Sequence, residues 1–140
     1  MKNVLTIAGS DSSGGAGIQA DIKTMGALGV HGMSVITAVT AQNSLGVQKS
    51  FPIIGEQLES LFSDIEIDGV KIGMVSDIEI IKIIREKLLK YSAKNIVIDT
   101  VMVSKNGYHL LKPEAIEELK SLISISTLVT PNIPEAEILS

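Results

Sequence analysis

The chain contains no cysteine and no tryptophan, and aromatic residues make up only 3% of its 140 residues. Without cysteine there is neither a disulfide framework nor a thiolate metal site, which is compatible with a reducing compartment. The few aromatic rings offer little to stack on bases, and the formal net charge of −4 is not the basic footprint of a nucleic-acid-binding protein. We therefore exclude nucleic acid as the main partner.

Long hydrophobic runs are also missing. The N-terminal run Val4–Ala8 is too short for the core of a signal peptide, and no later run approaches the length of a membrane span. We therefore expect a protein that does not engage a membrane and that works in the cytoplasm.

Short hydrophobic runs are abundant, since hydrophobic residues form 45% of the chain. Runs of strand length alternate with helical patterns throughout, which predicts one α/β domain with a mainly parallel sheet flanked by helices. The predicted strands are Val4–Ala8, Ser34–Thr40, Val70–Gly73, Asn95–Asp99 and Thr127–Thr130. A further short extended piece is expected near Val47–Ile53.

Helical spacing of apolar residues marks four segments between these strands. Gly29 should end the first helix, and Pro113 should be the first residue of the fourth. The core-facing residues expected on the four helices are Ile18, Ile22 and Met25; Leu58, Leu61, Phe62 and Ile65; Ile81, Ile84 and Leu88; and Ile116, Leu119 and Ile123.

A glycine-rich segment from Ala8 to Asp21 follows the first predicted strand and indicates a small-ligand site, because glycine lets the backbone approach a bound molecule closely. A Walker phosphate loop is excluded, since Gly17 is not followed by Lys-Ser or Lys-Thr. A dinucleotide site is excluded because the second strand ends in Thr-Ala-Gln-Asn without an acidic residue. The alternative is that the glycines only make a tight turn from strand to helix.

Polar and specific residues follow the predicted strands at the edge where ligands bind in an open parallel sheet. They are Gly9 and Asp11, Gln42 and Asn43, Gly73 and Met74, Asp99 and Val101, and Asn132 and Glu135. Asp99 is the strongest candidate among them, because a carboxylate at a buried strand end needs a compensating partner.

Each other candidate also has a purely structural interpretation. Asp11 is equally suited to a turn, Asp21 to an exposed helix surface, and Met74 to core filling. Asn132 and Glu135 together suit a helix cap with an acid in the first turn. The two histidines do not form a plausible metal pair, and we expect structural or surface roles for them.

Four separated motifs resemble the bacterial hydroxymethylpyrimidine and phosphomethylpyrimidine kinases of thiamine biosynthesis. They are the segment Ala8–Asp21, Lys71-Ile72-Gly73-Met74, Asp99-Thr100-Val101-Met102-Val103 and Thr130-Pro131-Asn132-Ile133-Pro134-Glu135. The resemblance extends over all 140 residues in order and implies a ribokinase-like fold. It also implies ATP- and Mg²⁺-dependent phosphorylation of 4-amino-5-hydroxymethyl-2-methylpyrimidine, first to the monophosphate and then to the diphosphate.

The resemblance implies two groups of site residues. The residues similar to the pyrimidine pocket are Gly9, Asp21, Gln42, Met74 and Val101. The residues similar to those near Mg²⁺ and the ATP phosphates are Asp99, Asn132 and Glu135. Of these, Asp99 and Glu135 are candidates for indirect contact with the metal.

Members of this family are about twice as long as this chain, and their second half supplies the anion hole, the general base and most of the adenine pocket. We therefore expect residues 1–140 to be the N-terminal portion of one ribokinase-like domain, cut after about the fifth strand, with no catalytic residue of its own and no activity alone. A small-molecule substrate is expected, and relatives are commonly homodimers.

Two rival functions remain open. Pyridoxal kinases share this sequence pattern, but Gln42 favours an aminopyrimidine, because relatives specialised for pyridoxal tend to carry a different residue there. The second rival is a noncatalytic pyrimidine-binding module, since a chain that keeps only the pocket could bind without turnover.

Overall fold

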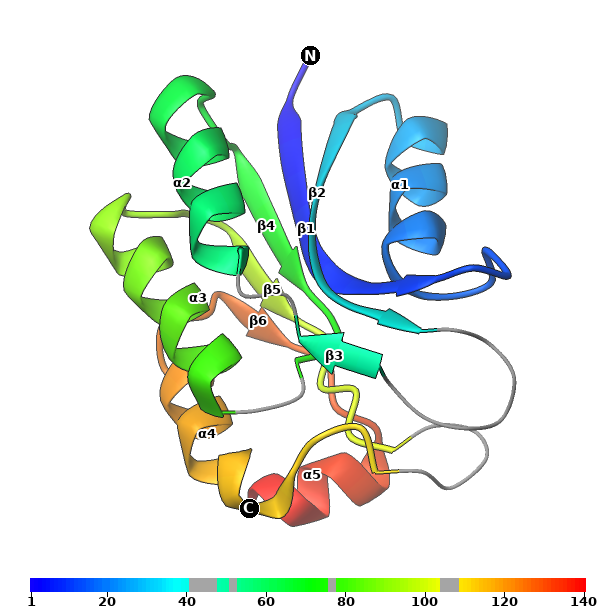
Figure 1. The fold of residues 1–140 in the computed structure, drawn as a ribbon, viewed down its shortest axis with the longest axis vertical. Coiled ribbons are helices and arrows are strands. Elements are labelled where there is room, and N and C mark those ends of the chain that lie inside the picture. Colours follow the sequence, from blue (N-terminus) through cyan, green and yellow to red (C-terminus); the bar gives the residue numbers. More distant parts are fainter. Residues whose placement is uncertain (41–47, 51–52, 76–77, 104–108) are drawn as a thin grey trace.

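The computed structural model describes residues 1–40, 48–50, 53–75, 78–103 and 109–140. Its strands form one sheet in the order β3-β2-β1-β4-β5-β6, in which only β2 and β3 are antiparallel neighbours (Figure 1). The bounds are β1 Asn3–Asp11, β2 His31–Thr40, β3 Gln48–Ser50, β4 Gly69–Ile72, β5 Ile96–Ile98 and β6 Leu128–Val129. The five predicted strands and the mainly parallel sheet are confirmed, and the expected extended piece is β3.

Helices cover the two faces of this sheet unequally. Helix α1 packs on one face over β1 and β2, whereas α2, α3 and α4 line the other face (Figure 1). The bounds are α1 Gly17–Ala27, α2 Ile54–Asp64, α3 Ile78–Lys90, α4 Ile116–Ile123 and α5 Ile133–Leu139. None of the helices in the described ranges is long and apolar enough to cross a membrane.

The main core lies between the sheet and helices α2 to α4. Leu5 and Ile7 of β1 point into it and are completely buried, as are Ile81 and Ile84 of α3. Each such side chain contributes about 1.5–3 kcal/mol relative to leaving it in water. On the opposite face of the sheet the intervening residue Thr6 lies beside Lys71 of β4. One sheet face is therefore apolar, whereas the other carries polar groups.

Two helix boundaries test the sequence predictions. Helix α1 ends where expected, because Gly29 adopts a φ of +73° and its N–H donates to the carbonyl of Gly26 at 3.1 Å. Pro113 does not begin α4 itself but a 3₁₀ turn, η1 (Pro113–Ala115), that precedes it. Proline has no N–H to leave unpaired, so it suits the first turn of either helix type.

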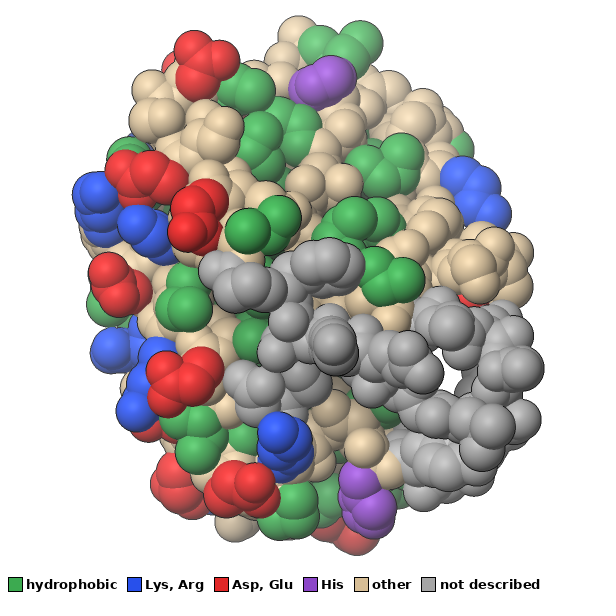
Figure 2. Space-filling model, viewed as in Figure 1, with side chains coloured by type: hydrophobic (Ala, Val, Ile, Leu, Met, Phe, Trp, Pro, Cys, Tyr) green, Lys and Arg blue, Asp and Glu red, His purple; other side chains and the backbone are tan. Residues whose placement is uncertain are grey.

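Charged side chains of both signs lie intermixed along the side of the molecule formed by α2 and α3 (Figure 2). In the face shown there, hydrophobic side chains gather between this charged side and the region of β1 and β2. The charges of α2 and α3 thus form a mixed, solvated surface of the kind that keeps a small domain in solution.

Candidate functional site

The glycine-rich segment is held in shape by Asp11, the last residue of β1. Its carboxylate accepts hydrogen bonds from the Ser13 hydroxyl at 2.8 Å, the Ser13 N–H at 3.0 Å and the Ala16 N–H at 2.9 Å. The Ser13 hydroxyl, followed by its N–H, lowers the pKa of this carboxyl below its usual value. Of the two interpretations of Asp11, the structure supports the turn carboxylate.

Gly17 brings the start of α1 against the end of β1. Its φ is +58°, and a Cβ at this position would overlap the carbonyl oxygen of Gly9. The side chain of Gln19 ties the same two elements, since it accepts from the N–H of Asp11 at 2.9 Å and donates to the Ser10 hydroxyl at 2.8 Å. The turn interpretation of the glycines is thus correct for Gly17, and this turn fixes the direction of α1.

Asp21 lies one helical turn after Gly17 and faces the sheet. Its Oδ2 accepts from the Thr6 hydroxyl at 2.6 Å and from the Lys71 ammonium at 3.0 Å, and its side chain is only 18% exposed. Among the described residues, none donates a hydrogen bond to its other oxygen, Oδ1. Asp21 is therefore not a solvated surface residue, and the described residues leave one of its two oxygens without a donor.

Lys71 lies beside Asp21, and the sequence analysis named it within a motif without giving it a role. Its ammonium lies between two carboxylates, 3.0 Å from Asp21 Oδ2 and 3.9 Å from Asp99 Oδ2. A Cβ at Gly73 would come within 2.9 Å of this ammonium, so the glycine leaves the space that it occupies. The available signal was a lysine within an otherwise apolar strand, where an unpaired charge is costly.

Met74 and Gly9 meet at the carboxyl ends of β4 and β1. The terminal methyl of Met74 lies 2.5 Å from the position that a Cβ on Gly9 would take, so a larger residue at position 9 would displace this methyl. The carbonyl of Met74 accepts from the buried Thr37 hydroxyl at 2.8 Å. The structure thus brings together Gly9 and Met74 of the predicted pyrimidine pocket.

Of two further residues of that predicted pocket, the structure describes Val101 but not Gln42. Val101 is half-buried after β5, where its N–H donates to the Asp99 carbonyl at 2.9 Å. Gln42 lies outside the described residues, as does Asn43.

Asp99 is more exposed than its place after an apolar run led us to expect. Its N–H extends the sheet by donating to the Ile72 carbonyl at 2.8 Å, yet 45% of its side chain is accessible. The expectation of a buried carboxylate was wrong, because β5 ends at Ile98 and the next side chain is already at the polar rim. Lys71 provides the neighbouring positive charge.

Asn132 and Glu135 form a capping box at the start of α5. The Glu135 N–H donates to Asn132 Oδ1 at 2.9 Å, and the Asn132 N–H donates to Glu135 Oε2 at 3.0 Å. The same Glu135 oxygen accepts from the Thr100 hydroxyl at 2.9 Å, which links α5 to the segment after β5. The cap interpretation is thus correct for both residues, and their role near phosphate stays a prediction.

In the described part of the chain, no three carboxylate or imidazole groups cluster in a way that could hold a metal ion. A hydrated Mg²⁺ needs few protein ligands, because water and substrate phosphates supply most of its coordination. The accessible carboxylate of Asp99 fits such an indirect contact, whereas Glu135 Oε2 is already used by two donors.

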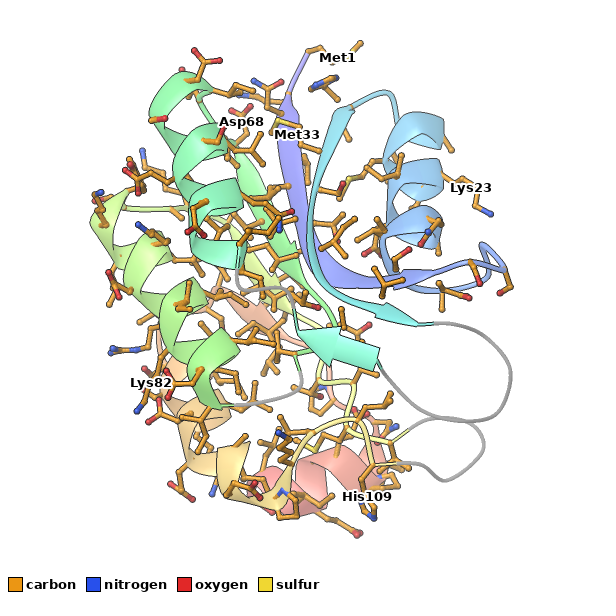
Figure 3. All side chains as sticks on the ribbon, in the orientation of Figure 1. Met1, Lys23, Met33, Asp68, Lys82 and His109 are labelled. Atoms are coloured by element: carbon orange, nitrogen blue, oxygen red, sulfur yellow. The ribbon has the colours of Figure 1, made fainter. Side chains whose placement is uncertain are left out.

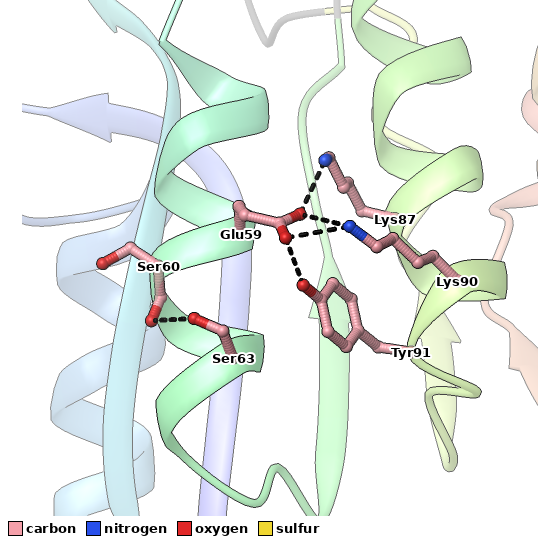
Figure 4. A network of polar contacts seen from close by, with 6 residues as sticks. All are labelled: Glu59, Ser60, Ser63, Lys87, Lys90 and Tyr91. Carbon is pink, nitrogen blue, oxygen red and sulfur yellow. Dashed lines mark hydrogen bonds and ion pairs between the residues drawn. The ribbon is translucent and has the colours of Figure 1, made fainter.

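A second carboxylate with several donors, Glu59, lies away from the carboxyl ends of the strands, between α2 and α3 (Figure 4). Glu59 accepts from Lys87 at 2.7 Å on Oε2, from Lys90 at 2.9 Å on Oε1, and from the Tyr91 hydroxyl. These donors, Lys87 first, lower the pKa of Glu59 from 4.5 to about 2. Tyr91 also stacks on Phe62 with ring centroids 5.3 Å apart. This cluster joins two helices.

Comparison with known proteins agrees with this architecture. Residues 11–140 match the family model described as phosphomethylpyrimidine kinase. The chain is 52% identical over 139 residues to the hydroxymethylpyrimidine/phosphomethylpyrimidine kinase of Escherichia coli (strain K12), an alignment that includes 96% of this chain. It also superimposes on the crystal structure of phosphomethylpyrimidine kinase from Clostridium difficile 630 with a TM-score of 0.91 and 57% identity, covering 100% of this chain and 63% of that one.

A pyridoxal kinase is a more distant structural relative. The Staphylococcus aureus enzyme in complex with AMP-PCP and pyridoxal has a TM-score of 0.85 and 39% identity, and the match covers 100% of this chain and 51% of that one. This chain likewise spans about half of the Escherichia coli protein, 52% of its length. The ribokinase-like fold expected from the sequence is confirmed by these likenesses, and the chain belongs to the phosphomethylpyrimidine kinase family.

Proposed function

We propose that this chain carries the pyrimidine site of an ATP-dependent kinase that phosphorylates 4-amino-5-hydroxymethyl-2-methylpyrimidine and then its monophosphate. The observation that carries the proposal is Asp21, whose Oδ2 accepts from two donors while no described residue donates to its Oδ1. An aminopyrimidine offers an amino group that donates to such an oxygen, and a flat ring with two apolar faces.

The neighbouring residues suit the rest of this substrate. Met74 and Val101 would pack on the ring, and the bare Cα of Gly9 would let the ring approach the backbone. Gln42 would supply a second polar contact to the ring. Met74 and Val101 follow the ends of β4 and β5, at the edge of the sheet where ligands of open α/β folds bind.

The phosphate side of the site would lie around Asp99. Its carboxylate, 3.9 Å from the Lys71 ammonium, would orient a metal-bound water rather than touch the metal. Mg²⁺, when bound, would neutralise charge on the phosphates during transfer. Asn132 and Glu135 would position the start of α5 beside the phosphates through the capping box. The use of ATP is supported by the related pyridoxal kinase that binds AMP-PCP.

Pyridoxal is the second candidate substrate, favoured by the 39% identity to the Staphylococcus aureus pyridoxal kinase. The higher identities to the pyrimidine kinases favour the pyrimidine as the main substrate. We further propose that the general base and the anion hole come from the portion of the kinase fold that the longer relatives contain, and that the protein acts as a homodimer in the cytoplasm.

A calorimetric titration of this chain with hydroxymethylpyrimidine, compared with pyridoxal, tests the proposal. We expect saturable binding that prefers the pyrimidine and that weakens about tenfold in Met74→Ala, because an apolar contact with the ring is lost. Met33→Ala is the matched control, since Met33 lies near the opposite end of the sheet, close to the N-terminus (Figure 3). Its affinity should equal that of the unaltered chain.

Three other results would change the assignment. Tighter binding of pyridoxal would make pyridoxal the substrate. Phosphate transfer from ATP by these 140 residues alone would contradict the assignment of the general base and the anion hole to the rest of the kinase fold. Absence of binding to either compound in a folded chain would contradict a pyrimidine site formed by these residues.

A further inference from the structure

We infer that Lys71 is a positioning residue that sets the preference for the 4-amino group of the substrate, by fixing which oxygen of Asp21 faces the ligand. This inference rests on the proposed function, because it concerns the same pyrimidine site. The family resemblance gives no role to this lysine. Its position in an inner strand of the sheet, where a charge needs partners, calls for an explanation.

The placement of Lys71 is unusual because β4 lies between β1 and β5 in the sheet. A charge in an inner strand is costly to bury unless it is paired. The fold provides the partners from distant segments: Asp21 comes from α1 and Asp99 from the end of β5. Only 26% of the lysine side chain is exposed, so its ammonium is held among these groups rather than solvated freely.

The surroundings also fix where the ammonium lies. Gly73 leaves the space next to it, since a Cβ there would lie 2.9 Å from Lys71 Nζ and 3.0 Å from the Cβ of Ala8. Thr6, the direct neighbour of Lys71 in the β1–β4 register, is completely buried and donates to the same Asp21 oxygen. Two donors from neighbouring strands therefore converge on Oδ2.

This convergence has a chemical consequence for Asp21. A carboxylate with two donors on one oxygen cannot rotate without breaking a charge-assisted hydrogen bond, so Oδ1 keeps one direction. An ionised carboxylate only accepts hydrogen bonds, which favours a ligand that donates at that point and disfavours one that lacks the donor. Lys71 would thus act through Asp21 and never touch the substrate.

The experiment compares two ligands in calorimetric titrations of the 140-residue chain: hydroxymethylpyrimidine and its analogue without the 4-amino group. In Lys71→Met we expect the preference for the amino compound to fall about tenfold, since hydrogen bonds to a charged, well-positioned group have at least that effect on affinity. Thr6→Val, which preserves shape and removes one donor, should lower the preference in the same direction but less. Lys82→Met is the matched control, because Lys82 projects from α3 on the other side of the sheet (Figure 3), and it should leave the preference unchanged.

A purely structural role for Lys71 predicts a different pattern, in which both ligands weaken equally and their ratio is constant. That result in either Lys71→Met or Thr6→Val would overturn the inference, and Thr6→Val decides alone if Lys71→Met does not fold. If the unaltered chain binds neither ligand, the proposed function fails and the inference, which concerns the same site, falls with it. Binding of both ligands with a constant ratio in the variants refutes the inference alone.

Discussion

Asp21 and Glu59 are both carboxylates paired with lysine, but the donors are distributed differently over their oxygens. Glu59 receives donors on both oxygens, from two lysines and a tyrosine of α3 and the turn after it. Among the described residues, Asp21 receives two donors, and both bind Oδ2. A carboxylate with both oxygens engaged joins two pieces of the protein, whereas one with a single engaged oxygen can also recognise a ligand.

The two clusters also differ in place. Glu59 is 40% exposed on helices that cover the apolar face of the sheet, where water screens ion pairs. Asp21 is 18% exposed on the opposite face, near the carboxyl ends of the strands. The same chemical pairing therefore contributes cohesion in one region and directed hydrogen bonding in the other.

The largest expected effect is on the stability of the chain. It comes from the turn at Gly17, which precedes the helix of Asp21 and not that of Glu59. Gly17→Ala should destabilise the chain by about 3 kcal/mol, because alanine pays for a positive φ and its Cβ would overlap the Gly9 carbonyl. Denaturant unfolding measures this change. Gly26→Ala is the control within the same helix, since a Cβ there meets nothing within 4 Å, and it should stabilise by about 0.5–1 kcal/mol. Equal effects of the two changes would contradict the role given to the turn.

A smaller effect, on the affinity for the ligand, distinguishes Asp21 from Glu59. Asp21→Asn should weaken binding of hydroxymethylpyrimidine by about 2 kcal/mol, as expected for the loss of a hydrogen bond to a charged group. Glu59→Gln makes the same chemical change in the other cluster and should leave the affinity unaltered. The measurement is a calorimetric titration of each variant, and comparable losses in both would remove the distinction between them.

The smallest effect is present near neutral pH and disappears in acid. Because the folded state lowers the pKa of Glu59 from 4.5 to about 2, its cluster stabilises the fold above pH 4.5, and this contribution is lost as the pH falls towards 2. Thermal unfolding of the unaltered chain and of Glu59→Gln should therefore differ near neutral pH and converge on acidification. A difference that stays constant from pH 6 to pH 2 would show that Glu59 does not titrate as described.

Much of the fold could be predicted because its signals are local. Apolar runs gave the five strands, Gly29 ended α1, and the pair Asn132 and Glu135 at cap spacing matched the capping box at α5. The site could be predicted only in part, because its contacts join distant segments. Lys71 reaches Asp21 across 50 positions of sequence, a contact that depends on strand order rather than on any local pattern. The exposure of Asp99 depends in the same way on where β5 stops.

The strand order has a consequence for how the chain folds. The first strand, β1, is an inner strand of the sheet, with β2 on one side and β4 on the other. Val4 pairs with Gly32 and also with Gly69. Because β1 is made before β2 and β4, its second edge stays uncovered until residues far along the chain exist. Such non-local pairing slows folding and leaves an apolar strand open to wrong partners in the meantime. The same arrangement that brings Thr6 beside Lys71 therefore leaves β1 with one uncovered edge until β4 has been made.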